Sequence, residues 1–360
     1  MVVGIDTRPL RNREDALRLQ ELVYTGYGLT YHRSFMYEPE RLLDLNARGL
    51  IRSMLAVDAS SGVVIGHLGS IRPWFEMATT EEQLQPTTCV EMGLSIVHPD
   101  YRGQAVQGTM AMACVAHERA VNPALRSIFT KCLTRHLMSQ KSSRRMGGRA
   151  GAMFLGGVPG WVIHDSERRP QPMTTLLMHV ATTENHGTAY LPPRWADVVR
   201  EMLAGSNQNR DIVAVAPGSA RSTGGASVVR SWFEPSRRRG VLNVRSGGAD
   251  LVEAVMEKVH WMAGGHMEHI TVLVPIDTPE VAAALPELEA CGLFFGGYLP
   301  DIDGRDCVLM QWLDCDTLDI AAIDVIGDEA MLLRDAVSRE WQRARALGLG
   351  RPAGDSALAG

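Results

Sequence analysis

The sequence lacks several features that would assign it to a class at once. It has no run of eighteen apolar residues, and its opening MVVGIDTRPLRNRED has no apolar signal core, so we expect a cytoplasmic protein without a membrane partner. Its six cysteines form no Cys-x-x-Cys pair, which fits neither a disulfide framework nor a zinc site, so we expect buried or idle thiols and no metal cofactor. A net charge of -5 disfavours general binding to nucleic acid.

The composition is that of a folded α/β protein. Hydrophobic residues make up 45% and charged residues 21% of the 360 residues, so a substantial core can be buried, and the length favours two domains. Asn12 and Asp15 suit a helix start, which predicts a helix over 12–27 behind a first strand. Turn formers at 58–62 separate two β-rich runs and predict a hairpin within 49–72.

The rest of the chain shows one order of elements twice: strand, helix, strand, helix, strand, strand. We therefore infer an internal duplication at the level of architecture. The first copy is assigned to residues 88–181, and its elements include strands at 88–97, 126–134 and 173–182 and helices at about 104–121 and 135–147. The second copy has strands at 240–245, 269–276, 292–300 and 306–313 and helices at 249–263 and 279–291. The expected organisation is a first domain at 1–182, a connector at 183–204, a second domain at 205–345 and a flexible tail at 346–360.

One stretch, VHPDYRGQAVQGTM at 97–110, reads as a strand end, a turn and a helix start. Such a helix start leaves a row of unpaired backbone N–H groups at a positively polarised end, which is suited to an anion. Arg102 adds a planar fork of donors that fits phosphate oxygens. An arginine and a glycine in a turn before a helix are also common without any ligand.

The longer stretch EMGLSIVHPDYRGQAVQGTM resembles the signature of the GNAT superfamily of acyltransferases. The resemblance implies an α/β fold with a mixed, centrally split β-sheet flanked by helices, here duplicated in tandem. It also implies that the strand, turn and helix bind the pyrophosphate and pantetheine arm of coenzyme A. The donor-binding residues expected from it are Ser95, Ile96, Val97, Arg102, Gly103, Gln104, Ala105, Val106, Gln107, Gly108 and Thr109, together with Ser139 on a later helix.

This stretch departs from the family pattern at two small positions, which are Ala105 and Gln107 here. We expect Ala105 to adopt a helical start and Gln107 to place a bulky amide where a phosphate oxygen would approach. A phosphopantetheinyl carrier protein presents one phosphate and its own docking surface, so the altered loop favours an acyl or peptidyl carrier protein over acyl-CoA as donor. Because the Gln107 amide can itself donate to phosphate, acyl-CoA stays open. Similar tandem proteins include some that accept aminoacyl-tRNA.

Transfer to an amine needs a base, and the departing thiolate benefits from an acid. By resemblance, Glu91 is the general base, and alternation along its strand predicts that it shares a face with Gly93, Ser95 and Val97. Alternatively, Glu91 only pairs with a cation. Ser143 stands where the family usually has a tyrosine that serves as the general acid. Serine is too weakly acidic to replace it, so Ser143 is expected to orient water.

His136 lies near the start of the same helix and suits a proton relay, although a lone histidine near a helix start is more often structural. His266 and His269 have a spacing that can bind metal on a helix, but two glycines precede His266 and a strand follows it. A metal site is therefore not expected there.

Two arginine clusters are further candidates. The default interpretation of Arg237, Arg238 and Arg239 is a solvated loop, although the group could also grip an acidic carrier protein or an RNA backbone. The second cluster is Arg144, Arg145 and Arg149, close in sequence to the predicted donor site.

The hypothesis from these residues is a tandem GNAT-like acyltransferase whose first domain carries the donor site and whose second lacks it. It would move an acyl group from a pantetheine thioester to a nitrogen, or an oxygen, of a small molecule, as in specialised metabolite biosynthesis. The alternatives are an aminoacyl-tRNA-dependent transferase and a GNAT-like binding or regulatory module without catalysis.

Overall fold

A computed structural model describes residues 4–135, 137–158, 173–220, 224–314 and 318–347. The chain divides into two compact units, and each is described by itself. Unit 1 comprises residues 1–131 and 159–172, and unit 2 comprises residues 132–158 and 173–360. The division falls inside one strand, between Lys131 and Cys132.

Unit 1 begins as the sequence predicts. Asn12 caps the first helix by accepting a hydrogen bond from the backbone N–H of Asp15 at 3.0 Å, which satisfies one of the unpaired donors of the first turn. The elements of unit 1 are β1 (Ile5–Pro9), α1 (Arg13–Tyr27), η1 (Ser34–Tyr37), α2 (Pro39–Ala47), β2 (Ile51–Asp58), β3 (Val64–Ile71), η2 (Phe75–Met77), α3 (Thr80–Leu84), β4 (Cys89–Val97), η3 (Pro99–Tyr101), α4 (Val106–Val121) and most of β5 (Ser127–Leu133).

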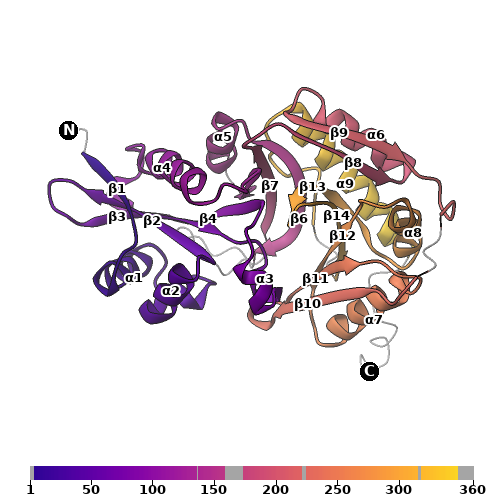
Figure 1. The fold of residues 1–360 in the computed structure, drawn as a ribbon, viewed down its shortest axis with the longest axis horizontal. Helices are drawn as coiled ribbons and strands as arrows, with labels where there is room; N and C mark the ends of the chain where they lie inside the picture. The colour runs from indigo at the N-terminus through magenta and orange to yellow at the C-terminus, as the bar shows by residue number, and fades with distance from the viewer. Residues whose placement is uncertain (1–3, 136, 159–172, 221–223, 315–317, 348–360) are drawn as a thin grey trace. The chain divides into compact units, whose positions relative to one another are not determined.

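The sheet of unit 1 has the order β1-β2-β3-β4-β5 and helices on both faces (Figure 1). The first four strands are antiparallel neighbours, and β5 runs parallel to β4. Helix α1 packs on one face, where Gly26 lies against Ile96, and α4 packs on the other, where Val106 and Met110 lie against Gly66. The apolar residues of α1 and α2 therefore form a core with only one side of the sheet.

The sheet of unit 1 is split beside β5. Strand β4 pairs with β5 only over Cys89–Glu91 and Ser127–Phe129. Farther along, β4 contains a β-bulge opposite β3, and Leu94 within the bulge has a φ of 55°. A bulge bends the strand that carries it. The mixed, centrally split sheet flanked by helices is thus confirmed.

Unit 2 carries the remaining elements. Cys132 and Leu133 at the end of β5 also belong to unit 2. The strands and helices of the second copy begin after β9. The elements of unit 2 are α5 (Met138–Arg145), β6 (Arg149–Val158), β7 (Met173–Ala181), β8 (Asn185–Leu191), α6 (Pro193–Leu203), β9 (Gln208–Ala214), β10 (Val228–Glu234), η4 (Pro235–Arg237), β11 (Arg239–Ser246), α7 (Leu251–Gly264), β12 (His269–Pro275), α8 (Pro279–Ala290), β13 (Phe294–Ile302), β14 (Arg305–Leu313) and α9 (Asp328–Ala346).

The main sheet of unit 2 has the order β7-β6-β13-β14-β12-β11-β10. The order β11, α7, β12, α8, β13, β14 along the chain repeats β4, α4, β5, α5, β6, β7, and β11 is parallel to β12 as β4 is to β5. The tandem architecture predicted from the sequence is therefore present. The front of the second copy differs, because β8 and β9 form a separate parallel pair.

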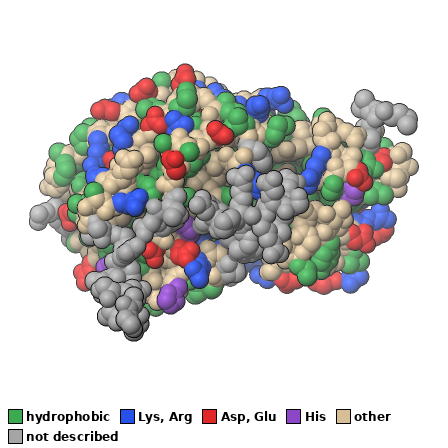
Figure 2. All heavy atoms as spheres, turned by 180° about the vertical axis from the view of Figure 1, so that it is seen from behind, with side chains coloured by type: hydrophobic (Ala, Val, Ile, Leu, Met, Phe, Trp, Pro, Cys, Tyr) green, Lys and Arg blue, Asp and Glu red, His purple; other side chains and the backbone are tan. Residues whose placement is uncertain are grey.

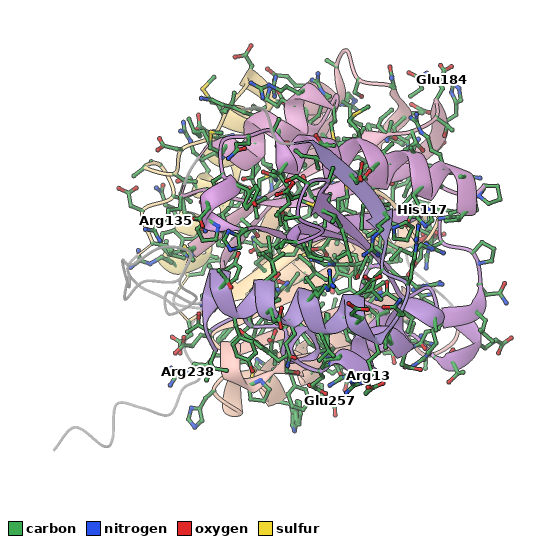
Figure 3. The ribbon with its side chains drawn as sticks, turned by 90° about the vertical axis from the view of Figure 1, so that its left-hand side faces the viewer. Arg13, His117, Arg135, Glu184, Arg238 and Glu257 are labelled. Atoms are coloured by element: carbon green, nitrogen blue, oxygen red, sulfur yellow. The ribbon has the colours of Figure 1, made fainter. Side chains whose placement is uncertain are left out.

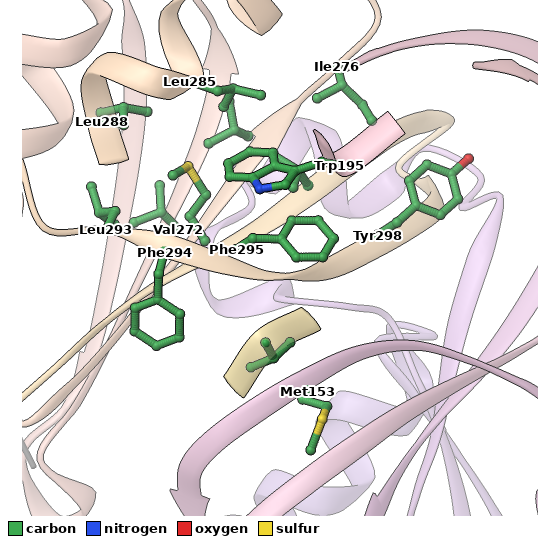
Figure 4. Close-up of a cluster of buried hydrophobic side chains, with 14 of the residues drawn as sticks. Met153, Trp195, Val272, Ile276, Leu285, Leu288, Leu293, Phe294, Phe295 and Tyr298 are labelled. Carbon is green, nitrogen blue, oxygen red and sulfur yellow. The ribbon is translucent and has the colours of Figure 1, made fainter. Parts of the chain in front are cut away.

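The core of unit 2 is apolar and rich in large side chains (Figure 4). Trp195 from α6 stacks on Phe295 from β13 with ring centroids 5.0 Å apart. Leu285 and Leu288 from α8 are fully buried in the same cluster. Burial of such side chains typically contributes about 2 kcal/mol each, so this cluster holds α6 and α8 against the sheet.

The division into units differs from the domains expected from the sequence. Strands β6 and β7 belong to unit 2 because β6 pairs with β13, as Ala152 does opposite Gly297. The expected connector at 183–204 forms β8 and α6, and most of the expected tail lies outside the described residues. The boundary at 182 stays a proposal. In the part of the chain that the structure describes, no helix combines the length and apolarity required to cross a membrane.

Candidate functional site

The predicted donor loop follows β4 and is anchored to the β2–β3 hairpin. The His98 backbone N–H donates to Ile65 at 2.9 Å, and the Tyr101 hydroxyl donates to the Asp58 carboxylate at 3.1 Å. Hydrogen bonds from the Ser60 backbone and side chain lower the pKa of Asp58 to about 2. Asp58 is therefore ionised at neutral pH and holds the loop as an acceptor.

The next residues form an exposed turn before α4. Arg102, Gly103, Gln104 and Ala105 are all exposed, and a β-carbon placed at Gly103 would meet nothing within 4 Å. Gly103 has a φ of 78°, in the region that favours glycine. The turn is open enough for a ligand to approach its backbone.

Ala105 differs from the expectation. It does not adopt a helical start but has φ 62° and ψ 9°, in the left-handed region, and serves as N-cap of α4. The physical reason is that the chain must reverse here before the helix, which is the conformation a glycine adopts without strain. Ala105 therefore has the left-handed backbone conformation that favours glycine, at a position where the GNAT pattern has a small residue.

The first turn of α4 has no side-chain cap. Gln107 is half-buried in this turn, and Gly108 is exposed with open space around its Cα. The N-terminal N–H groups of α4 are thus left for water or an anionic ligand. Val106 is buried under the loop, and Thr109 donates its hydroxyl to the Ala105 carbonyl at 3.1 Å.

The β-bulge corrects the predicted face of β4. Gly93 lies opposite Gly69, whereas Val97 lies opposite Gly66. Gly66 and Gly69 are three residues apart on β3 and so face opposite sides of the sheet. Glu91 and Gly93 therefore point to the α1 side and Val97 to the α4 side. Alternation fails because the bulge inserts one extra residue, which sequence periodicity cannot reveal.

Ser95 and Ile96 flank the same bulge. Ile96 is buried against α1, while Ser95 is half-buried. The predicted donor contacts on β4 are thus divided between the two faces.

Glu91 forms an ion pair with Lys131 of β5, with its Oε2 2.6 Å from the lysine Nζ. Both side chains are largely buried, with 15% and 18% exposed. Gly93 makes room for the carboxylate, since a β-carbon there would lie 3.2 Å from Oε1. The pairing with a cation expected as the alternative is present, and the role of Glu91 as base stays a prediction.

Two aromatic rings surround the Lys131 ammonium. Its Nζ lies 5.5 Å from the Trp74 ring centroid and 5.7 Å from that of Phe129, within the range of cation–π attraction. Sequence reasoning missed Lys131 and Trp74. The available signal was a single lysine inside the buried strand RSIFTKCLT, two residues after Phe129.

Tyr31 also lies near this carboxylate. Burial is the main cause that raises the pKa of Tyr31 well above its usual value, and the charge of Glu91 raises it further, while Arg33 acts in the opposite direction. Arg33 pairs with Glu76 at 2.9 Å. The charge of Glu91 thus acts on Tyr31 as well as on the Lys131 ammonium.

The decisive features are the parallel pair β4 and β5, which parts after Glu91, and the loop and helix that follow β4. They occur in the element order that the motif implied. The chain has the GNAT fold.

No protein-family model and no curated protein sequence matches the chain. It is similar to solved structures that include mutant forms of a spermidine/spermine N-acetyltransferase of Vibrio cholerae, at 14% identity over 49% of this chain and 93% of that chain, with a TM-score of 0.36. It is also similar to a ribosomal-protein-S5-alanine acetyltransferase of Vibrio fischeri, at 12% identity over 49% of this chain and 92% of that chain, with a TM-score of 0.36. A third similar structure is an N-acetyltransferase of Staphylococcus aureus, at 11% identity over 49% of this chain and 98% of that chain, with a TM-score of 0.37.

The remaining residues implied by the GNAT resemblance belong to unit 2 or fall outside the described residues. Ser139 and Ser143 lie on α5 of unit 2. Ser143 is 1% exposed, and its carbonyl accepts the Gly148 N–H at 2.9 Å. His136 lies outside the described residues. Their predicted roles stay predictions.

The first arginine cluster is not the solvated loop that the sequence suggested. Arg237 and Arg239 are each 7% exposed; Arg237 donates to the Gly157 carbonyl, and Arg239 lies over the Phe154 ring. The burial follows from the strands β10 and β11, which draw these residues into unit 2. Arg238 is exposed, pairs with Glu268 and reaches the periphery (Figure 3).

The second arginine cluster also serves internal contacts of unit 2. Arg144 pairs with Glu329, and Arg149 donates to the carbonyls of Met202 and Ala204. Basic and acidic side chains are interspersed over the face shown in Figure 2. Each cluster has one arginine that is exposed, Arg238 in the first and Arg145 in the second.

The two spaced histidines lie in different conformations. His269 begins β12 and is buried, and burial lowers its pKa to about 4. His266 has a φ of 62° in the preceding turn. Within the described ranges, no group of three or more potential metal ligands occurs.

The cysteines match the expectation of buried thiols where the structure describes them. Cys89, Cys114, Cys132 and Cys307 are buried and Cys291 is half-buried, and none of the five forms a disulfide. Burial raises the pKa of Cys114 to about 12. Such a thiol stays protonated at neutral pH and is a poor nucleophile. Cys315 lies outside the described residues.

Proposed function

We propose that the chain is an acyltransferase that moves an acyl group from a pantetheine thioester to a nitrogen of a small-molecule acceptor. The observation that carries this proposal is the parting of β4 from β5 beside an exposed loop and an uncapped helix start, with the Glu91 carboxylate at the split. The donor loop supplies N–H groups for phosphate, and the split offers a path for an extended arm.

The donor is acyl-CoA or an acyl or peptidyl carrier protein. Arg102 is exposed in the loop and would meet a phosphate with its guanidinium. Gln107 replaces a small residue beside the helix start, which favours a donor with one phosphate. Because Gly103 and Gly108 leave open space, the backbone still permits close approach.

In the proposed reaction Glu91 accepts a proton from the acceptor amine. The amine nitrogen then attacks the thioester carbonyl carbon, a C–N bond forms, and the C–S bond breaks. The thiolate takes up a proton, for which His136 and Ser143 remain the candidate routes. The Lys131 Nζ lies 2.6 Å from the Glu91 carboxylate and orients this candidate base.

Calorimetric titration with coenzyme A, acetyl-CoA and a phosphopantetheinylated carrier protein tests the donor. We expect one of them to bind in the micromolar range and Arg102→Ala to weaken binding about tenfold or more, because a charge-assisted contact is lost. Arg41→Ala is the matched control, since Arg41 is exposed on α2.

The outcomes separate the candidate functions. Binding of coenzyme A makes the protein an ordinary acyl-CoA enzyme, and binding of the carrier alone supports the altered-loop argument. If none binds, the donor site is absent, and a transferase that uses aminoacyl-tRNA or a module without catalysis replaces the proposal. Loss of turnover in Glu91→Gln with intact donor binding would support the base assignment.

A further inference from the structure

Four residues of unit 1 form what we term the Glu91–Lys131 site: Glu91, Lys131, Trp74 and Phe129. The carboxylate and ammonium are 2.6 Å apart, and both rings lie within 6 Å of the ammonium nitrogen. The two rings are themselves stacked, with centroids 6.0 Å apart and planes inclined by 24°. The site thus combines one negative group, one positive group and two apolar faces.

The backbone explains why these groups meet. Glu91 lies opposite Phe129, and this is the last residue pair that β4 and β5 share. Lys131 is two residues farther along β5, so it projects to the same face as Phe129. The ion pair therefore stands where the two strands part.

Trp74 adds evidence that the site is built for a ligand. It has φ 48° and ψ 35°, a left-handed conformation that is an outlier for a bulky residue. Such a conformation costs about 1–3 kcal/mol and persists where the surroundings require it, often at binding sites. Here it places the indole against Phe129 and over the Lys131 ammonium.

We propose that the acceptor is an α-amino acid, whose amine meets Glu91, whose carboxylate meets Lys131 and whose side chain lies along the two rings. The proposal rests on the proposed acyltransferase function and names its substrate class. Glu91 and Lys131 adjoin each other, so their ligand groups must adjoin each other too, as they do when both are carried on one carbon atom.

Charge balance favours this class over a simple amine. An amine without a carboxylate would bring a second positive charge beside the Lys131 ammonium, and like charges at short range repel. An α-amino acid replaces both partners at once. During transfer Glu91 takes one proton from the ammonium, and the free amine forms a C–N bond to the thioester carbonyl carbon as the C–S bond breaks. The departing thiolate takes up, through water, the second proton that the nitrogen loses, which yields an N-acyl amino acid.

Binding without any donor tests the proposal first. Phenylalanine, leucine and serine are each compared with their carboxamides, which keep the size and the amine and remove the negative charge, by calorimetry on the full chain. We expect at least one acid to bind about tenfold or more tightly than its amide, and Lys131→Met to abolish that preference. Lys141→Met is the control, because Lys141 is exposed on α5.

Turnover with acetyl-CoA provides the second measurement. For Lys131→Met we expect a raised KM for the acid and little change for its amide, and Lys131→Arg should recover part of the preference. Equal binding of every acid and amide, or a preference that survives in Lys131→Met, would overturn the proposal. If coenzyme A and the carrier do not bind but the acid preference is present, the acyltransferase function fails while the amino-acid site stands.

Discussion

At the residue scale, Gly93 controls the position of the candidate base. A β-carbon at this position would lie 3.2 Å from Glu91 Oε1 and 3.3 Å from Ile71 Cδ1. Both neighbours would have to move by a few tenths of an ångström. Since the carboxylate is also held by Lys131, we expect its displacement to change the geometry of the proposed proton transfer more than it changes the core.

We therefore expect Gly93→Ala to lower kcat about tenfold, because a small displacement of a catalytic group lowers the reaction rate strongly. The free energy of unfolding should change by no more than about 1 kcal/mol. Gly264→Ala is the control, since nothing lies within 4 Å of a β-carbon there. Steady-state kinetics beside thermal unfolding distinguishes the two effects, and unchanged kcat would show that the carboxylate position is not limiting.

At the element scale, the donor loop depends on two left-handed positions, Gly103 and Ala105. Gly103→Ala should lower the free energy of unfolding by about 1 kcal/mol despite the open space, because an L-residue is strained at φ 78°. Ala105→Gly should raise it by about 0.5 kcal/mol, since relief of strain exceeds the added flexibility of glycine. Denaturant unfolding of both variants checks the pair. Equal stability of Gly103→Ala and the unmodified chain would contradict the described turn.

The elements themselves follow largely from local sequence. Asn12 caps α1, turn formers separate β2 from β3, and Pro99 follows β4, so the predicted bounds agree with the structure within a few residues. Local signals suffice here because each depends on neighbours in the chain. Helices α2, α6 and α9 were not predicted, although Pro39 and Pro193 stand at the first position of α2 and α6, where proline is favoured.

The candidate site could be predicted only in part. Glu91 and the loop follow from a motif, but the partner Lys131 lies 40 residues away and meets Glu91 through parallel strand pairing. Trp74 reaches the site through an unusual backbone conformation. Contacts that depend on strand register, a bulge or backbone strain leave no periodic pattern, and these are the ones that sequence reasoning missed.

At the scale of the whole molecule, three buried histidines govern the response to acid. Burial lowers the pKa values of His67, His179 and His269 to about 4 each. His67 lies in unit 1, where its Nδ1 is 2.8 Å from the Leu94 carbonyl, and the other two lie in unit 2. All three favour the neutral ring in the folded state.

The contribution of these histidines to the free energy of unfolding should therefore be fully present above the ordinary histidine pKa of about 6.5. It should fall as pH decreases toward 4, because in this range the unfolded chain binds protons at these histidines and the folded chain does not. Each histidine adds a slope of about 1 kcal/mol per pH unit in this window. Denaturant unfolding at pH 7 and pH 4.5 measures the loss, and His67→Asn should reduce it. A stability that is constant between these pH values would contradict the neutral buried rings.

The pairing of β6 with β13 bears on how the duplicated protein arose in evolution. These are equivalent strands of the two repeats, joined edge to edge within unit 2. A protein with only one repeat would expose that strand edge, which other chains can then bind. A second subunit of the same kind could cover it, and duplication followed by fusion would place both subunits in one gene product. The second repeat, for which the sequence predicts no phosphate loop, would then be retained because it completes the sheet of the first.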